Sequence, residues 1–597
     1  MKSINDFDLK DIIKDKEYYP SPRSWEDQVM YFLLVDRFSD AKEDQRDVYT
    51  SDDYENIYKN DNEKEWESWK DKYNGGNIKG VISKLDYLKD LGITTIWLSP
   101  IFKQVPFQES YHGYGIQNYL DVEPHLGNKE DLKTLVKEAH KRDMYVILDI
   151  IINHSGDVFA YEESGPKYNG EFFDVKGFRD KNGDPNISVE KLASKDIDIE
   201  DAIWPKELQT LDAYECKGEI QDWENYPEYI RGDFMSLKTH YLGTQKDNGF
   251  EISKALKVLT KAYSYWIGEF DIDGYRLDTV KHVEPEAIKY FVRELHEFAH
   301  NIGKDNFYII GEITGGFDFA YETMQKTGLD AALGINNIPN TLEEVAKGKQ
   351  EPKNYFDIFS NTDILGIDEN LWYKDNVVTM FDDHDMVSLG EDLKYRFTAN
   401  KDTSKLLKNC LFLNVLTSGI PCVYYGTEQA FDGKGNGDAY VREAMFGSKY
   451  GAFRTQDVHF FDTSNNVYKE LSDILNLRNK HTALRHGRQF LRKISKDGKN
   501  FDLPQKIGDS RIETIVAWSK ILSNDEILLA FNTSVDKELT YYILLDDNLV
   551  GKETKFECIY ASNEEKINKT IDVKLIDDNL VLKITIEPFG RIAFIKD

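Results

Sequence analysis

The fold is decided by the stretch Gly274-Tyr275-Arg276-Leu277-Asp278-Thr279-Val280-Lys281-His282, which directly follows the apolar–polar run Glu269-Phe270-Asp271-Ile272-Asp273. If the stretch begins as a β-strand, alternate residues share a face, so Arg276 and Asp278 lie side by side. An arginine held against an aspartate favours the ionised carboxylate, which a carboxylate nucleophile requires near neutral pH. Taken alone, such a pair is more often a structural ion pair at a strand end. The rest of the chain has to decide between these two interpretations.

Apolar runs of strand length recur along the chain and alternate with helical patterns. The segments 78–91, closed by Gly92, and 129–142 carry apolar residues at helical spacing. Eight strand–helix repeats close a (β/α)8 TIM barrel, whose active site lies at the carboxyl ends of the strands. The sequence therefore predicts an α/β fold built on such a barrel. Its predicted strands are residues 29–35, 93–98, 144–149, 270–276, 307–311, 330–335, 376–381 and 420–425.

Segments that do not fit the alternation of strands and helices predict further domains. A polar N-terminal segment ends at the breaker Pro20-Ser21-Pro22. The interval between Asp149 and Asp278 is far longer than one strand–helix unit, which predicts an inserted domain after the third strand. Short alternating segments near the C-terminus predict an antiparallel β sandwich. The expected domains are an N-terminal arm (1–27), the barrel (28–154 and 243–486), the insert (155–242) and a C-terminal all-β domain (487–597).

Composition limits the class of partner. The net charge of −31 repels phosphate backbones and anionic membrane surfaces, so we expect neither a nucleic-acid nor a membrane partner. The 35 Tyr and 33 Phe slightly favour a carbohydrate ligand, because flat rings stack on sugar faces. Four scattered cysteines predict buried, reduced thiols rather than disulfides or a zinc site. The first residues lack the apolar region of a signal peptide, and we expect a cytoplasmic protein.

Polar residues gather at the predicted strand ends. The third strand leads into Asp149-Ile150-Ile151-Ile152-Asn153-His154, and the fourth ends in Arg276 and Asp278. The fifth ends in Gly311-Glu312 and the seventh in Phe381-Asp382-Asp383-His384-Asp385. A cluster of like charges on one rim is costly unless it is used. The salt-bridge interpretation of Arg276 and Asp278 is then the weaker one.

These stretches, in this order and spacing, resemble the α-amylase superfamily, glycoside hydrolase family 13. The resemblance covers about residues 28–480 and implies a retaining α-amylase-type glycosidase. It implies that Asp278 is the nucleophile, Glu312 the general acid/base and Asp385 a third carboxylate that holds sugar hydroxyls. Physical roles agree, since Glu312 has no arginine two residues away and can hold a proton. Supporting matches are Tyr111-His112-Gly113-Tyr114, Gly92 to Pro100 and Gly419 to Glu428.

Further residues match substrate-binding positions of that family. Tyr114 matches a stacking platform, and Lys281 matches a residue on the leaving-group side of the substrate. A lone histidine is usually structural, but these histidines lie beside motif residues at strand ends. The residues that the resemblance assigns to substrate binding are Arg276, His154, His282, His384, Tyr114, His112 and Lys281.

The resemblance implies no cofactor for the chemistry but a structural calcium ion. Asn153 matches a calcium ligand, and Asp233 from the insert is a candidate second ligand. Met235-Ser236-Leu237-Lys238-Thr239 departs from the Pro-Asp-Leu-Asn type of segment that many relatives carry, which puts the metal in question. The acidic stretch 39–73 is either a solvated excursion or a separate calcium loop.

The leading hypothesis is a retaining glycoside hydrolase that cleaves α-1,4-glucosidic bonds of α-glucans or maltooligosaccharides by double displacement. Thr279, after the nucleophile, resembles members that cleave α-1,4 rather than α-1,6 bonds. The alternative is an α-glucan transglycosylase of the 4-α-glucanotransferase type, because a sugar hydroxyl instead of water can resolve the same intermediate. A non-catalytic sugar-binding barrel would require the loss of a catalytic carboxylate, and all three are present.

Overall fold

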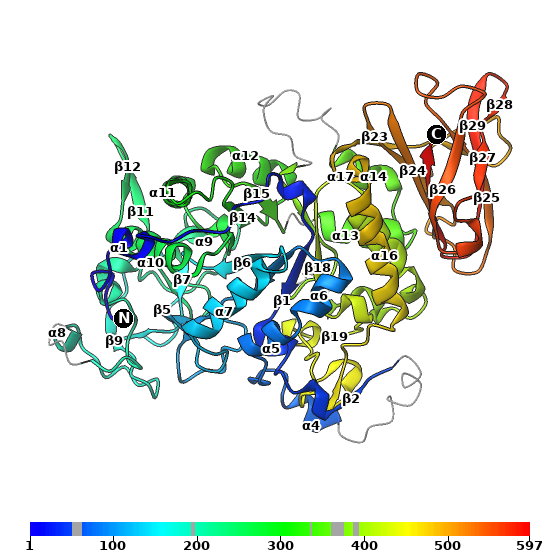
Figure 1. The fold of residues 1–597 in the computed structure, drawn as a ribbon. Helices are drawn as coiled ribbons and strands as arrows, with labels where there is room; N and C mark the ends of the chain where they lie inside the picture. The colour runs from blue at the N-terminus through cyan, green and yellow to red at the C-terminus, as the bar shows by residue number, and fades with distance from the viewer. Residues whose placement is uncertain (51–62, 193–196, 335–336, 360–374, 386–392) are drawn as a thin grey trace.

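An eight-stranded parallel sheet forms the centre of the molecule (Figure 1). The computed structural model describes residues 1–50, 63–192, 197–334, 337–359, 375–385 and 393–597. A parallel bridge between Ala332 and Val377 joins the two outermost strands, so the sheet closes on itself. The predicted barrel is therefore confirmed. Its strands, in sheet order, are β15 (Ala331–Leu333), β14 (Tyr308–Glu312), β13 (Gly274–Leu277), β6 (Tyr145–Ile150), β3 (Thr95–Leu98), β1 (Met30–Leu33), β18 (Ile420–Tyr424) and β16 (Val378–Thr379).

Helices surround the barrel and cover its outer face. Every residue of β1 and β3 is buried, as expected for parallel strands with helices outside and a filled barrel inside. The helix expected over 78–91 is divided at Lys84, and Gly92 ends it in the left-handed conformation (φ 105°). The helices are α5 (Ile78–Ser83), α6 (Leu85–Leu91), α7 (Lys129–His140), α10 (Lys254–Phe270), α11 (Pro285–Asn301), α12 (Phe317–Thr327), α13 (Asn337–Ala346), α14 (Pro352–Asp357), α15 (Leu407–Leu416), α16 (Asn466–Lys480) and α17 (Thr482–His486).

The fourth strand starts later than the sequence pattern predicts. Phe270 is the last residue of α10, and Asp271 caps that helix in the left-handed conformation (φ 61°). Only Gly274–Leu277 pairs with its neighbours as β13. The prediction that Phe270 belongs to the strand was wrong, because the buried face of α10 continues to this residue. The apolar side chain of Phe270 packs on Trp266, one helical turn earlier (4.9 Å between ring centroids).

The N-terminal residues pack against the amino-terminal ends of the barrel strands. Trp25 stacks on Tyr308 with ring centroids 4.6 Å apart, and Tyr19 stacks on His140 at 4.2 Å. His140 Nε2 lies 2.8 Å from Asp273 Oδ2. Burial by itself lowers the pKa of this imidazole, but the two carboxylates beside it raise the pKa of His140 to about 9. Asp271 is the second of these carboxylates, 3.4 Å from Nδ1.

His140 should therefore make stability depend on pH at this face. Its contribution is complete below the ordinary histidine pKa of about 6.5 and disappears as the pH rises to about 9. The shift corresponds to at most about 3 kcal/mol of unfolding free energy. We expect His140→Gln to be less stable than wild type at about pH 6 and nearly equal above pH 9. Thermal unfolding of both proteins across this range measures the difference, and a pH-independent difference would contradict the assignment.

The insert lies between β6 and α10, at the edge of the molecule opposite the C-terminal domain (Figure 1). Its strand β10 pairs antiparallel with β7, which fixes the end of the insert to the segment that leaves β6. The β11–β12 hairpin follows before α10 begins. The elements in and next to the insert are β4 (Phe102–Gln104), β5 (Ile116–Val122), β7 (His154–Ser155), β8 (Phe159–Tyr161), β9 (Val175–Phe178), α8 (Val189–Leu192), α9 (Glu228–Arg231), β10 (Lys238–Thr239), β11 (Gly243–Lys246) and β12 (Gly249–Ile252).

The C-terminal domain consists of two antiparallel sheets with a core of their own. It confirms the predicted all-β sandwich. Arg591 joins it to the barrel helices through Glu470 (2.8 Å) and Asn409 (2.7 Å). One sheet holds β21 (Arg488–Leu491), β23 (Ile515–Leu522), β24 (Asp525–Asn532), β30 (Arg591–Lys596), β26 (Lys555–Ala561) and β27 (Thr570–Asp572), and the other β22 (Ile494–Ser495), β25 (Leu539–Leu544), β29 (Asn579–Ile586) and β28 (Lys574–Ile576).

Three further sequence expectations concern the cysteines, a membrane-spanning helix and the acidic stretch 39–73. All four cysteines are buried free thiols, as predicted. Within the described ranges, no helix combines the length and the apolarity needed to cross a bilayer. In the acidic stretch 39–73, residues 51–62 lie outside the described residues. Before that gap, Asp40 forms an ion pair of 2.7 Å with Arg46.

Candidate active site

One buried guanidinium joins three carboxylates at the carboxyl ends of three adjacent strands. Arg276 on β13 is 1 % exposed and stands level with Asp149 on β6 in the parallel register. Its Nη1 donates to Asp149 Oδ1 (3.0 Å) and to Asp278 Oδ1 (2.6 Å). Its Nη2 lies 3.1 Å from Glu312 Oε1. The predicted side-by-side placement of Arg276 and Asp278 is confirmed, and the pair belongs to a larger cluster.

The left-handed backbone conformation of Thr279 lets its N–H bind the carboxyl of Glu312 next to Asp278. Thr279 has φ 50°, a conformation that a β-branched residue rarely adopts and that costs of order 1–3 kcal/mol. This turn directs the Thr279 N–H at Glu312 Oε2, to which it donates at 2.8 Å. The hydrogen bond from the strained turn therefore holds the carboxyl of Glu312 beside Thr279, the residue that follows Asp278. Strain of this kind is typical of functional sites.

The electrostatics distinguish Glu312 from an ordinary surface carboxyl. Burial is the largest influence, and together with the charge of Asp278 it outweighs the Arg276 guanidinium and raises the pKa of Glu312. We expected Glu312 to hold a proton because no arginine stands two residues away. That reason was wrong, since Arg276 reaches Glu312 through space. The direction of the pKa shift is nevertheless the one that a general acid requires.

Tyr114 and His384 extend the cluster by a chain of hydrogen bonds. The Tyr114 hydroxyl donates to Asp149 Oδ2 (3.0 Å) and lies 2.9 Å from His384 Nε2. On the other side of the ring, His384 Nδ1 lies 2.6 Å from Asp383 Oδ1. Asp149 also accepts from Trp97 Nε1 at 3.2 Å. Asp149 therefore links Arg276 by hydrogen bonds to the aromatic side chains of Tyr114 and Trp97.

Removing the Tyr114 hydroxyl tests this chain. Tyr114→Phe keeps a ring for stacking but leaves Asp149 and His384 without their common partner. On the maltooligosaccharides that the resemblance implies as substrates, we expect kcat/KM to fall by about 10- to 150-fold, because a hydrogen bond to a charged group contributes about 1.5–3 kcal/mol. Tyr114→Ala, which also removes the ring, should lose more. Steady-state kinetics of both variants measure the two contributions, and wild-type activity of Tyr114→Phe would exclude the hydroxyl from the mechanism.

His154 and His282 lie on the side of the site that faces the insert. Both rings contact Phe234, with centroids at 5.4 and 4.5 Å. Burial lowers the pKa of His154 to about 3 and also lowers the pKa of His282. His282 Nδ1–H donates to the carbonyl of Tyr229 at 2.6 Å, so its Nε2 is left as an acceptor in the neutral ring. These two neutral imidazoles are suited to hydrogen-bonding sugar hydroxyls.

His112 is neutral for a similar reason. Its Nδ1 accepts the Tyr114 backbone N–H at 3.1 Å, so its Nε2 carries the proton. Burial lowers the pKa of His112 to about 3. The ring stacks on Tyr114 with centroids 5.7 Å apart. His112 thus supports the Tyr114 ring within the candidate site.

Within the described ranges, the ion pairs of Asp385 and Lys281 are with residues other than Arg276 and its three carboxylates. The Asp385 side chain is 47 % exposed and pairs with Lys394 at 3.2 Å. Lys394 also pairs with Asp438 at 3.1 Å. Residues 386–392, which follow Asp385, lie outside the described residues. Lys281 Nζ lies 2.5 Å from Glu224 Oε1 of the insert.

Sequence reasoning placed Asp149 at the end of the third strand but gave it no role, and it assigned no role to the aromatic residues of the insert. Asp149 was recognisable in principle, because it ends the third strand at the level that Arg276 occupies in the fourth. Trp223 carries no such signal. Its ring packs edge-on against His282 (5.7 Å) and Phe234 (4.9 Å), and it comes from irregular chain that no periodicity predicts.

The expected calcium ligands do not form a metal cage. Asp233 Oδ1 accepts the Thr239 N–H (2.9 Å), and Oδ2 accepts the Tyr161 hydroxyl (2.6 Å). The amide of Asn153 lies 3.2 Å from His154 Nδ1. An internal ammonium, Lys238 Nζ, lies 3.9 Å from Asp233 Oδ2, and a divalent cation there would be repelled. Over the described residues, no group of three or more His, Cys, Asp or Glu side chains is arranged to hold a metal.

Comparison with known proteins identifies the family. Residues 32–457 match the family model described as Alpha amylase, catalytic domain. An alpha-amylase of Streptomyces lividans is 30 % identical over 486 residues, 75 % of this chain and 51 % of the relative, so the chain spans about half of that protein's length. A cyclomaltodextrin glucanotransferase of Klebsiella oxytoca is 26 % identical over 499 residues, 77 % of this chain and 66 % of the relative.

A solved structure supports the fold. The alpha-amylase of Geobacillus thermoleovorans, crystallised with acarbose, superimposes with a TM-score of 0.66 at 24 % identity and covers 96 % of this chain and 99 % of that one. The family model covers most of the barrel and every strand-end residue discussed above. The chain therefore belongs to the α-amylase family of glycoside hydrolases, family 13.

Proposed function

We propose that the protein is a retaining glycoside hydrolase that cleaves α-1,4-glucosidic bonds of α-glucans or maltooligosaccharides. One observation carries the proposal: Arg276 holds Asp278 and Glu312 on a single guanidinium while burial raises the pKa of Glu312. Double displacement requires a nucleophilic carboxylate and a carboxylic acid held close together, and the raised pKa of Glu312 suits the role of the acid.

The reaction follows from these positions. Asp278 attacks the anomeric carbon of the glucosyl unit as Glu312 donates its proton to the departing glycosidic oxygen. The glycosyl–oxygen bond to the leaving sugar breaks, and an ester to Asp278 forms. Glu312, now a carboxylate, removes a proton from water, which attacks the same carbon and releases Asp278. Two inversions return the α configuration. Asp385 is proposed to hold sugar hydroxyls, which requires it to exchange Lys394 for the substrate.

A second candidate function is glycosyl transfer to another sugar. The favouring observation is Trp223, which is 37 % exposed and packs on His282 beside the cluster. An exposed indole beside the cluster can stack an acceptor sugar in place of water. The cyclomaltodextrin glucanotransferase among the relatives is consistent with this alternative.

Products from maltoheptaose distinguish the two functions. A hydrolase yields only oligomers shorter than the substrate, whereas a transferase also yields longer ones. Chromatography of early products, with Trp223→Ala as the matched variant, makes the assignment. Longer products from wild type that disappear in Trp223→Ala would support transfer. If the protein turned over none of starch, maltooligosaccharides, isomaltose, sucrose and trehalose, the proposed function would be contradicted.

A further inference from the structure

A buried lysine lies among carboxylates inside the insert. Lys238 is 5 % exposed and lies on β10, opposite Ser155 of β7. Its Nζ lies 3.0 Å from Asp157 Oδ1 and 3.9 Å from Asp233 Oδ2, and it donates to the Ser236 carbonyl at 2.7 Å. The ammonium is thus surrounded by carboxylate and carbonyl oxygens, the ligand type that hard cations such as calcium also prefer.

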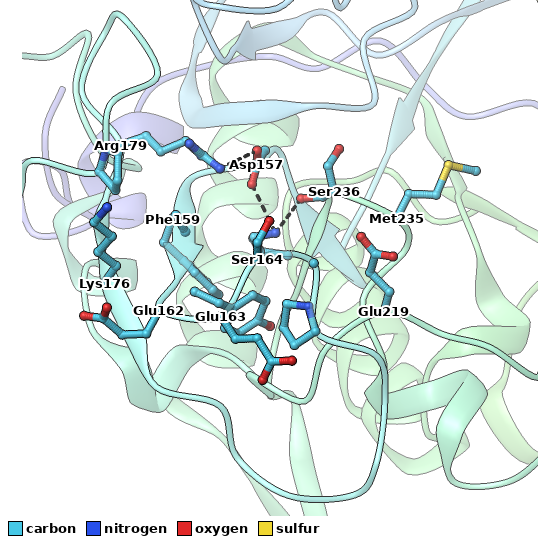
Figure 2. A pocket seen from close by; sticks show the side chains of 16 residues that line it. Asp157, Phe159, Glu162, Glu163, Ser164, Lys176, Arg179, Glu219, Met235 and Ser236 are labelled. Carbon is cyan, nitrogen blue, oxygen red and sulfur yellow. Dashed lines mark hydrogen bonds and ion pairs between the residues drawn. The ribbon is translucent and has the colours of Figure 1, made fainter.

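The groups that form ion pairs around Lys238 are two carboxylates and two cations. Asp157 and Asp233 are 8 % and 1 % exposed, and each would be costly to bury without a cation. Arg179 supplies the second positive charge, 3.0 Å from Asp157 Oδ2. Figure 2 shows Arg179, Asp157 and Ser236 around a pocket of about 330 Å³, with the Arg179–Asp157 pair dashed. These two carboxylates and two cations carry no net charge between them, and Lys238 occupies the position between Asp157 and Asp233 that a divalent ion would need. The same pocket is also lined by Glu162, Glu163, Glu219 and Lys176.

Two aromatic rings lie close to the ammonium of Lys238. Lys238 Nζ lies 5.4 Å from the centroid of the Phe159 ring and 5.3 Å from that of Tyr161. Both distances are within the range of cation–π attraction. Tyr161 also donates its hydroxyl to Asp233. The cluster therefore links β8, β10 and the segment that carries Asp233.

We propose that the Lys238 ammonium is the resident cation of the insert and joins β8, β10 and the segments of Asp157 and Asp233 in place of a metal ion. Because β10 pairs with His154 and Ser155, the same lysine fixes the segment that carries one of the candidate substrate-binding histidines. The fold of the insert, and the position of His154, are then independent of calcium.

The first test compares thermal unfolding of wild type in EGTA and in calcium chloride. We expect the same Tm in both, and a Tm that falls in EGTA and recovers with calcium would overturn the proposal. Lys238→Met should lower the Tm by roughly 5 °C or more, because two buried carboxylates lose a partner. The matched control is Lys176→Met, an exposed lysine that lines the same pocket. Equal Tm values for the two variants would also overturn the proposal.

The second test uses Lys238→Asn, which removes the ammonium and supplies an amide oxygen. If the lysine stands in for a metal, this variant should have a low Tm in EGTA that calcium chloride raises toward the wild-type value. A Tm that calcium does not change would contradict the equivalence of the ammonium and a metal ion. The readout is stability alone, so the result is independent of the proposed activity.

Discussion

Asp278→Asn is expected to lower kcat on maltooligosaccharides by at least about 10⁴-fold. The amide keeps the shape of the carboxylate but cannot form the covalent ester. The fold should remain, because Arg276 keeps Asp149 and Glu312 as partners. Circular dichroism and Tm establish that the variant is folded, and product release from maltoheptaose measures its activity.

The matched control for Asp278→Asn is Asp149→Asn. It removes one carboxylate from the same guanidinium but leaves the nucleophile in place. We expect kcat to fall by about 10²-fold, because Arg276 and Tyr114 lose a partner that orients them while the nucleophile is still present. Equal losses in the two variants, or full activity of Asp278→Asn, would refute the assignment of Asp278.

Glu312→Gln is expected to have the second largest effect, and the effect should depend on the leaving group. Glu312 protonates the departing oxygen, so a sugar leaving group should suffer a loss of about 10³-fold or more in kcat. Fluoride needs no such assistance. Hydrolysis of α-maltosyl fluoride should therefore form the glycosyl–enzyme at nearly the wild-type rate, measured as the fluoride released in the first turnover. An equal loss on both substrates would exclude Glu312 as the acid.

The raised pKa of Glu312 also predicts a pH profile. The protonated form is present below this pKa, so kcat/KM on maltooligosaccharides should fall as the pH rises through it. That alkaline limb should be absent in Glu312→Gln, whose side chain does not titrate. Persistence of the limb in the variant would assign it to another group.

Local periodicity predicted the parts of the site that depend on single strands. Arg276 and Asp278 share a face because side chains alternate along a strand, and Glu312 follows at the end of the next one. The contact between Arg276 and Glu312 depends on how adjacent strands stand in register, which no local pattern specifies. The left-handed turn at Thr279 could not be predicted either, because threonine rarely adopts that conformation.

The insert was the least predictable part. Its boundary near Asp149 followed from an interval too long for one strand–helix unit, but its interior has little regular structure. Asp233 was expected to hold calcium, whereas its oxygens are taken by Thr239 and Tyr161, with Lys238 nearby. The departure at Lys238 was visible in the sequence. The ion pair of Lys238 with Asp157 could not be predicted from the sequence, because the two residues meet only through the pairing of β7 and β10.

Trapping the covalent intermediate tests the central claim most directly. Glu312→Gln is incubated with α-maltosyl fluoride, which loads the enzyme while the missing base slows its release. Mass spectrometry of the intact protein and of its peptides then locates the added sugar. The account predicts one maltosyl group on the peptide that contains Asp278. Turnover without a label on that peptide, or a label on Asp149 or Asp383 instead, would contradict it.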